Sequence, residues 1–228
     1  MSNKKKTVEP QYQPLLDIQE EVGLVSLGLM SNQVWHEDPR RLAFMMARYK
    51  FVSRILEGKQ NVLEVGCGDA FASRIVQQSV GKLTVSDFDP LFIKDVQNRN
   101  SDGPWALTAI SHDMLAMPMS EEFDGIYLMD VIEHISPKDE ATFLSNLTQS
   151  VTSTGVVVLG APSLESQTYA SKQSKEGHVN CKTGKDFKKT LETYFENVFL
   201  FSMNDEVVHT GFTPMAHYLI AVCTQKKI

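Results

Sequence analysis

The chain has 228 residues, of which 42% are hydrophobic and 22% are charged, and its net charge is −6. This composition is typical of a globular protein and excludes collagen-like or disordered chains, and no apolar run approaches the roughly 20 residues that span a bilayer. The negative net charge argues against a nucleic-acid partner, because phosphate binding depends on basic side chains. We interpret the one dense basic run, Lys4–Lys6, as a solvated tail.

The first part of the chain is predicted to form a tail and a helical cap, residues 1–57. Apolar side chains recur at helical spacing over residues 12–30, but Gly23 and Gly28 interrupt them, which favours short helices. Residues 32–39 are expected to form a loop. Pro39 suits the first turn of a helix that continues to about residue 56.

Residues 58–228 are predicted to form one α/β domain. Short apolar runs predict strands at 62–65, 82–86, 106–110, 125–129, 155–160, 198–202 and 217–224, and helices are expected at 70–78, 90–98, 141–151 and 185–195. This alternation predicts a seven-stranded, mostly parallel, doubly wound sheet of the Rossmann-like type. Only a loop separates the last two strands, so we expect them to pair antiparallel, with the last strand reversed.

The strongest motif is a glycine turn that follows the first strand, Glu64-Val65-Gly66-Cys67-Gly68. Glycines permit a tight turn and a close approach of ligand to backbone, at the strand end where open α/β sheets bind ligands. The second strand ends in Asp87, nineteen positions after Gly68. An acid at this spacing is typical of a ribose-binding carboxylate.

A third acid, Asp113, follows the third predicted strand and is able to accept a hydrogen bond from an adenine amino group. Phe88 and Met114 offer apolar faces for the same ring, as expected of a mostly apolar pocket with few polar anchors.

The order and spacing of these pieces resemble the class I S-adenosylmethionine-dependent methyltransferases, over about residues 58–163. The matching segments include Glu64–Gly68, Asp87–Asp89, Asp113–Pro118, Phe123–Tyr127, Val131–Ile135 and Gly155–Val158. The resemblance implies S-adenosylmethionine as cofactor, S-adenosylhomocysteine as product, and a small molecule as methyl acceptor, with neither nucleic acid nor membrane as partner. It leaves a homo-oligomer open.

The resemblance also implies a role for each motif residue. Gly66 and Gly68 would pass close to the methionine part of the cofactor, and Glu64 would steady the loop or bind the amino group. Asp87 would hold the ribose. The adenine would lie against Phe88, Asp113 and Met114, and Asp130 would border the methyl donor.

On the acceptor side, histidines are the first candidates because they titrate near neutral pH. His134 follows the fourth predicted strand, and His178 and His209 lie in loops after the fifth and sixth. We predict these three as catalytic residues, with structural roles as the alternative. Trp35, in the cap, is interpreted as an anchor to the core rather than as part of a lid.

Metal binding is not expected. Asp130, Glu133 and His134 are of ligand type, but no second cluster with ligand spacing accompanies them. Cys67, Cys181 and Cys223 are odd in number and far apart, which argues against disulfides and zinc knuckles. Such cysteines fit a reducing compartment, so the expected location is the cytoplasm.

Three alternatives remain. A nicotinamide-binding fold would need a small residue at the third glycine position, where this chain has Phe71. A protein methyltransferase would carry an Asn or Asp followed by Pro-Pro after the fourth strand, where the chain reads Met129-Asp130-Val131-Ile132. A non-catalytic cofactor-binding sensor or partner subunit also stays open. A narrower resemblance, over 177–180 and 201–205, is to methyltransferases of sugar or surface-polymer biosynthesis.

Overall fold

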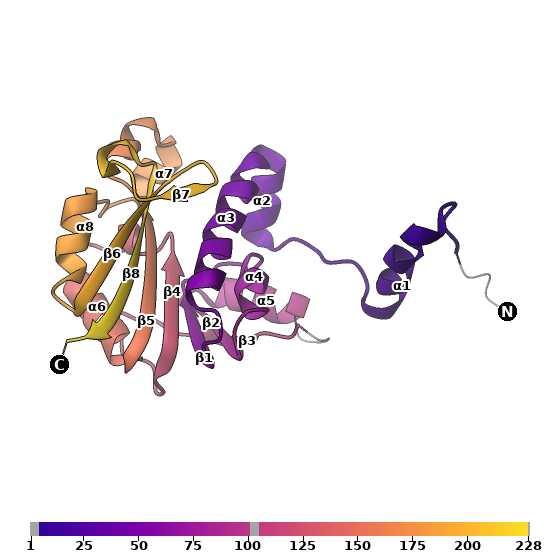
Figure 1. Ribbon diagram of the computed structural model, residues 1–228, viewed down its shortest axis with the longest axis horizontal. Coiled ribbons are helices and arrows are strands. Elements are labelled where there is room, and N and C mark those ends of the chain that lie inside the picture. The colour runs from indigo at the N-terminus through magenta and orange to yellow at the C-terminus, as the bar shows by residue number, and fades with distance from the viewer. Residues whose placement is uncertain (1–4, 101–104, 228) are drawn as a thin grey trace.

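A single mixed sheet organises the molecule (Figure 1). The computed structural model describes residues 5–100 and 105–227, so Lys4 of the predicted basic tail lies outside the described residues. The strands are β1 (Asn61–Val65), β2 (Lys82–Asp87), β3 (Thr108–Ser111), β4 (Phe123–Met129), β5 (Val151–Pro162), β6 (Phe195–Asn204), β7 (Val207–His209) and β8 (Tyr218–Lys226). Their order across the sheet is β3-β2-β1-β4-β5-β8-β6-β7.

The pairing matches the predicted doubly wound sheet with its last long strand reversed. Strands β3, β2, β1, β4 and β5 are parallel to one another, whereas β8 runs antiparallel to both β5 and β6. The prediction of seven strands misses β7, which is three residues long and pairs only with β6 at the edge. So short a strand gives no alternating pattern that a sequence could reveal.

Helices cover both faces of the sheet. The α-helices are α1 (Gln13–Val22), α2 (Leu29–Glu37), α3 (Arg40–Ile55), α4 (Ser73–Gln77), α5 (Pro90–Asn100), α6 (Glu140–Gln149), α7 (Lys172–Gly177) and α8 (Gly184–Leu191). Four short 3-10 helices complete the described elements: η1 (Pro10–Tyr12), η2 (Ile132–His134), η3 (Glu165–Tyr169) and η4 (Thr213–Met215).

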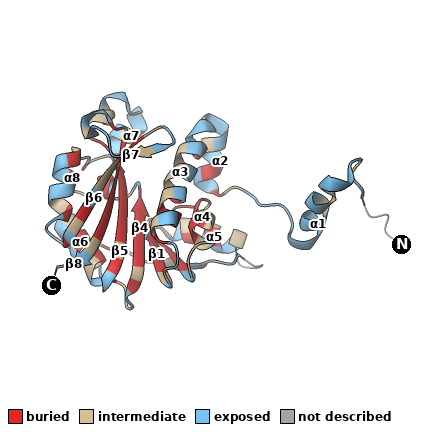
Figure 2. Cartoon of the chain, viewed as in Figure 1, coloured by how far each residue is buried: buried red, intermediate tan, exposed pale blue. Residues whose placement is uncertain are grey.

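The buried side chains form two clusters, one on each face of the sheet, and the central strands contribute to both. Figure 2 shows these strands as largely buried. Helices α3, α4 and α5 supply one cluster, for example through Val52 and Val76, and α6 and α8 supply the other, for example through Leu147 and Phe187. Burial on both faces explains why the strands read as continuous apolar runs rather than as alternating ones.

The N-terminal part differs from its prediction. The expected loop at 32–39 is wrong, because most of it belongs to α2, which starts directly after Gly28. Trp35 is 56% exposed and does not anchor the cap to the core. Helix α1 lies apart from the sheet at the end of an extended segment, and it contains no buried residue (Figure 1). Among the described residues, no helix is both long enough and apolar enough to span a membrane.

Candidate functional site

The turn after β1 has the backbone geometry of a ligand-binding turn. Gly66 and Gly68 have φ angles of 72° and 52°, in the left-handed region that glycine adopts without strain. The amides of Gly66 and Cys67 donate to the carbonyl of Ser86, which ties the turn to β2. The helix that follows begins only at Ser73, later than predicted, because the chain makes a further turn in which Ala70 also has a positive φ.

Asp87 lies directly beside this turn. Its carboxylate accepts hydrogen bonds from the Gly68 amide and the Asp89 amide, both at 2.9 Å. The side chain is only 6% exposed, and its backbone carbonyl accepts from the His112 amide, so the end of β3 lies alongside. The structure therefore brings the glycine turn, Asp87 and the start of the segment with Asp113 to one edge of the sheet.

The three predicted adenine contacts differ in their surroundings. Phe88 is 73% exposed and Asp113 is exposed, with one carboxylate oxygen accepting from the Leu115 amide. Met114 is buried and packs in the core below. Phe88 and Asp113 are thus free to contact a ligand, whereas the Met114 side chain is occupied by core packing.

Glu64 lies beneath the turn, where it is almost fully buried. Its carboxylate accepts hydrogen bonds from three hydroxyls, those of Tyr49 on α3, Ser73 on α4 and Tyr127 on β4. Burial raises the pKa of Glu64 and the three hydroxyl donors lower it, with a net rise to about 7. These contacts favour a role in steadying the framework rather than in binding an amino group.

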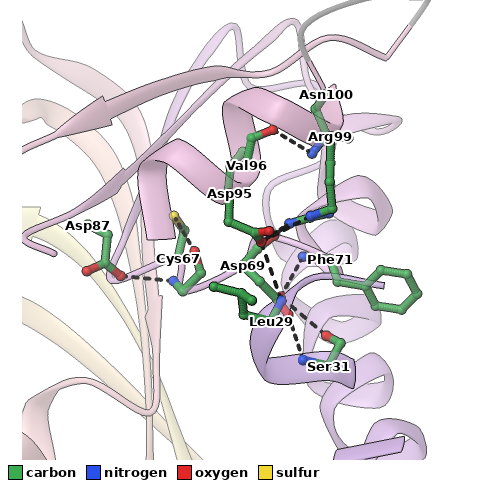
Figure 3. Close-up of polar contacts among 11 residues, drawn as sticks. Leu29, Ser31, Cys67, Asp69, Phe71, Asp87, Asp95, Val96, Arg99 and Asn100 are labelled. Atoms are coloured by element: carbon green, nitrogen blue, oxygen red, sulfur yellow. Dashed lines mark hydrogen bonds and ion pairs between the residues drawn. The ribbon is translucent and has the colours of Figure 1, made fainter. Parts of the chain in front are cut away.

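The start of α2 covers the glycine turn (Figure 3). The Ser31 amide donates to the Asp69 carboxylate at 2.6 Å, and the Ser31 hydroxyl bonds the other oxygen at 3.2 Å, both in buried positions. Arg99, paired with Asp95 on α5, also donates to the Asp69 carbonyl. A Cβ placed on Gly68 would lie 2.5 Å from the Met30 sulfur, so the Met30 side chain occupies the space beside the turn.

Asp130 follows β4 at the same edge and has an unusual backbone. Its φ is 57°, a left-handed conformation that Asp adopts more readily than most residues. Its carboxylate pairs with Arg48 of α3 at 2.7 Å, and the Arg48 guanidinium lies 3.7 Å from the centre of the Tyr218 ring. Burial acts to lower the pKa of Arg48, but Asp130, Tyr218 and Glu133 raise it overall.

The acceptor-side histidines are partly brought together. The rings of His134 and His178 meet edge to face with their centres 5.1 Å apart. Nδ1 of His134 lies 2.9 Å from the Gly177 carbonyl, and Nδ1 of His178 lies 2.9 Å from the Gln167 side-chain oxygen. Burial and the neighbouring His134 lower the pKa of His178.

His209 does not join this pair. Its Nε2 contacts the Asn204 side chain at 2.9 Å, and its Nδ1 accepts a hydrogen bond from the Gly211 amide. Both ring nitrogens are therefore engaged within the β6–β7 hairpin, which accounts for the residue structurally.

Glu133 was named from the sequence as a residue of ligand type but was not predicted as a site residue, and the structure gives it an unusual environment. It is 1% exposed, and neither carboxylate oxygen has a hydrogen-bond partner among the described residues. One oxygen of Glu133 and one nitrogen each of His134 and His178 lie within 4.8 Å of one another. Burial, and then the charge of Asp130, raise the pKa of Glu133 well above its usual range.

Some residues of the site could not be identified from the sequence. These residues contact the site only because distant parts of the chain fold together: Arg48 with Asp130 and Tyr218, and Ser31 with Asp69. The one local signal was for Asp69, an acid directly after the glycine turn.

Hollow volume does not mark the site. A hollow of about 540 Å³ lies between α3 and α4 and is lined by none of the predicted site residues, whereas one of about 150 Å³ is lined by Arg48 and Tyr218. The smaller hollow is the one that adjoins the predicted site, because Arg48 in its lining pairs with Asp130.

The comparisons with known proteins agree with this geometry. Residues 62–155 match the family model of a methyltransferase domain. No curated protein matches the chain in a sequence search.

Solved structures share the fold. The N-methyltransferase NodS from Bradyrhizobium japonicum WM9, in complex with S-adenosyl-L-homocysteine, is 17% identical, with a TM-score of 0.60 over 83% of this chain and 89% of that chain. The methyltransferase domain of bacterial CtHen1-C is 16% identical, with a TM-score of 0.67 over 81% and 100%. The plantazolicin methyltransferase BpumL, with S-adenosyl-L-homocysteine bound, is 13% identical, with a TM-score of 0.62 over 86% and 93%.

Proposed function

The chain carries a class I S-adenosylmethionine-dependent methyltransferase domain, and from this premise we propose that it transfers the methyl group of the cofactor to an oxygen or nitrogen atom of a small molecule. One observation carries the proposal. A Cβ on Gly66 would lie 2.4 Å from a methyl group of Val131, so the glycine turn directly contacts the segment that runs from Asp130 to His134. A cofactor at the turn would therefore have its reactive end beside the histidine pair.

The residues at the sheet edge suit the cofactor. Gly66 and Gly68 present backbone without side chains, as a closely bound ligand requires. The Asp87 carboxylate is suited to a ribose hydroxyl pair, and the exposed Phe88 and Asp113 are suited to an adenine ring and its amino group. When bound, the cofactor supplies an activated methyl group on a sulfonium, so the protein contributes mainly positioning and exclusion of water.

His134 and His178 are the proposed acceptor-side residues. They lie in loops at the carboxyl edge, where functional side chains concentrate in such folds. The similar structures include an N-methyltransferase and the plantazolicin methyltransferase, which supports a small-molecule acceptor. Sugars and sugar phosphates are the first acceptors to test, because of the resemblance over residues 177–180 and 201–205.

The proposal extends to the whole chain in three respects. We assign residues 1–57 to a cap and 58–228 to the catalytic domain, a division that falls between α3 and β1. We assign the protein to the cytoplasm, which its three free cysteines support. We leave a homo-oligomer open.

The first experiment is calorimetric titration of the full chain with S-adenosylmethionine and with S-adenosylhomocysteine. We expect both to bind, and we expect Asp87→Ala to weaken binding at least 100-fold. Asp89→Ala is the matched control, because the Asp89 carboxylate bonds only the Leu91 amide among the described residues. Absence of binding, or unchanged binding by Asp87→Ala, contradicts the proposal.

The second experiment separates an enzyme from a sensor. Release of S-adenosylhomocysteine is followed with sugar phosphates, phenols and amines as acceptors. Turnover with any of them supports catalysis, whereas tight cofactor binding without turnover across all three classes favours the non-catalytic alternative.

A further inference from the structure

Glu133, His134 and His178 form a compact group of potential metal ligands. They come from two segments, η2 and the loop after α7, which are joined by hydrogen bonds from the Val179 and Asn180 amides to the Glu133 carbonyl. One ligand atom from each side chain lies within 4.8 Å of the others. Atoms that share a cation at 2.0–2.2 Å lie roughly 3–3.5 Å apart, so small side-chain rotations would complete the coordination.

The hydrogen bonds of both histidines fix the tautomer that a metal needs. The Gly177 carbonyl and the Gln167 side-chain oxygen are acceptors, so Nδ1 of His134 and Nδ1 of His178 carry the protons. In each neutral ring, Nε2 then presents its lone pair. Metal-bound histidines characteristically donate their other ring N–H to a carbonyl or carboxylate in this way, which makes the two rings ready to act as ligands.

The buried carboxylate is the independent observation that points to a cation. Both oxygens of Glu133 lack a hydrogen-bond partner among the described residues, although the side chain is 1% exposed. A buried polar group without a partner is costly, and a buried charge is normally paired or coordinated to metal. The positive charge of the nearby Arg48 attracts Glu133, but its guanidinium hydrogen-bonds to Asp130 instead. No hydrogen bond from the described chain therefore satisfies the two Glu133 oxygens.

We propose that Glu133, His134 and His178 bind one divalent transition-metal ion. Two imidazoles and one carboxylate favour ions such as Zn²⁺, Mn²⁺ or Co²⁺ over Ca²⁺ and Mg²⁺, which prefer oxygen ligands alone. Three protein ligands leave open coordination positions, the arrangement of catalytic rather than structural sites.

The metal site deepens the proposed function, and its role in catalysis rests on that function. Because the cluster follows Val131, whose side chain lies against Gly66 of the glycine turn, an atom on the open positions would lie on the acceptor side. Zn²⁺, Mn²⁺ and Co²⁺ all bind hydroxyl oxygens at open positions, whereas an amine that binds a metal gives up the one lone pair it needs to accept a methyl group. The metal site therefore favours an oxygen acceptor, such as a hydroxyl or a vicinal diol, over a nitrogen acceptor. In the sequence, Glu133 and His134 are close to Asp130 and 44 residues or more before His178, so the third ligand of this group is not visible there and no metal was expected.

The test uses Co²⁺ as a spectroscopic probe on the full chain, purified without a polyhistidine tag and stripped with a chelator. We expect one equivalent of Co²⁺ to give visible d–d absorption that Zn²⁺ displaces. We expect His178→Ala and Glu133→Gln to weaken Co²⁺ binding at least tenfold. His209→Ala is the matched control and retains full affinity, because that ring is engaged in the β6–β7 hairpin.

Two outcomes overturn the metal site: no saturable Co²⁺ binding by a folded chain, or equal binding by wild type and His178→Ala. Circular dichroism of each variant establishes that it is folded. S-adenosylmethionine titration of the same samples separates the two proposals. Cofactor binding without Co²⁺ binding removes the metal site alone, and Co²⁺ binding without cofactor binding removes the proposed function alone.

Discussion

The turn after β1 and the segment after β4 meet at one edge of the sheet but are held there in different ways. The turn takes its backbone conformation from its own glycines, and its partner Asp87 ends the next strand along the chain, 19 residues after Gly68. The segment after β4 depends on partners far along the chain, since His134 bonds Gly177, 43 residues away, and Asp130 pairs with Arg48, 82 residues before it. We call the turn the cofactor half of the proposed site and the segment after β4 its acceptor half. The first carries its conformation in its own glycines, whereas the second is an assembly of distant segments.

This difference indicates in which half the geometry can vary between related proteins. A local motif keeps its geometry whenever the strand and helix around it form. An assembled half changes with every loop that contributes to it. Variants that affect one half and spare the other test whether the two are as independent as their construction suggests.

The largest expected effect concerns Glu64, beneath the cofactor half. Its pKa is about 7 in the folded protein and near 4.5 when unfolded. The folded state therefore retains a proton that the unfolded state loses between pH 4.5 and 7, and stability falls as pH rises through that window, by about 3 kcal/mol. Chemical denaturation of wild type and of Glu64→Gln at several pH values measures this loss of folding stability.

The difference between the two stability curves isolates Glu64 from Glu133, whose pKa is also raised. We expect the wild type to lose stability relative to Glu64→Gln as pH rises from 4.5 to 7. Parallel curves would show that Glu64 does not titrate there.

The second prediction breaks the cofactor half alone. Gly68→Ala puts a methyl group where the ligand approaches, and we expect affinity for S-adenosylmethionine to fall roughly 100-fold, about 2.7 kcal/mol. The new Cβ meets only the flexible end of Met30 within the fold. Co²⁺ binding should stay within twofold of wild type.

Gly58→Ala is the matched control for Gly68→Ala. Gly58 also has a positive φ, 81°, but a Cβ there meets nothing within 4 Å. Both variants bear a backbone cost of about 1 kcal/mol, so only a loss specific to Gly68→Ala reports on the ligand. Equal cofactor affinity in both would place the ligand elsewhere.

The third prediction breaks the acceptor half alone. Gln167→Leu removes the acceptor that orients His178, and we expect Co²⁺ affinity to fall at least tenfold, as for other residues behind metal ligands. Cofactor affinity should not change. Gln149→Leu, at an exposed position with bonds only inside α6, should leave both unaffected. A loss of cofactor affinity in Gln167→Leu would show that the halves are coupled.

The smallest effect concerns the cover over the cofactor half. Ser31→Ala removes the hydroxyl bond to Asp69, which we expect to weaken the docking of α2 by roughly 0.5–1 kcal/mol. Amides of α2 should exchange with deuterium two- to fivefold faster by mass spectrometry. Gln33→Ala, which removes an exposed bond within the same helix, should show no such change.

The sequence predicted the sheet and the cofactor edge because their signals are local. Strands buried on both faces read as apolar runs, and an acid at the end of β2 stands at a fixed spacing from the glycine turn. Helix α2 was missed because the polar residues Ser31, Asn32 and Gln33 follow its first two positions, and the contact of Ser31 with Asp69 that holds it is not visible in any local propensity.

The acceptor half could be predicted only in part. His134 was identified from its place after β4, but its partnership with His178 depends on how the loop after α7 folds back onto η2. His209 had the same kind of sequence context as His178, and only the hairpin contacts distinguish them. Residue type and strand order alone do not determine which loops meet.

The Met30 side chain lies against Gly68, in the space that a ligand approaching the turn would use. This side chain must therefore swing aside, by rotation about its own bonds or together with helix α2, before a ligand can enter and again before the product can leave. Under such gating, the observed association rate rises with ligand concentration only to a plateau, which equals the rate at which Met30 moves away. Release of product from the closed form is limited by the same step, so the cover sets a ceiling on turnover that no improvement in acceptor chemistry would raise.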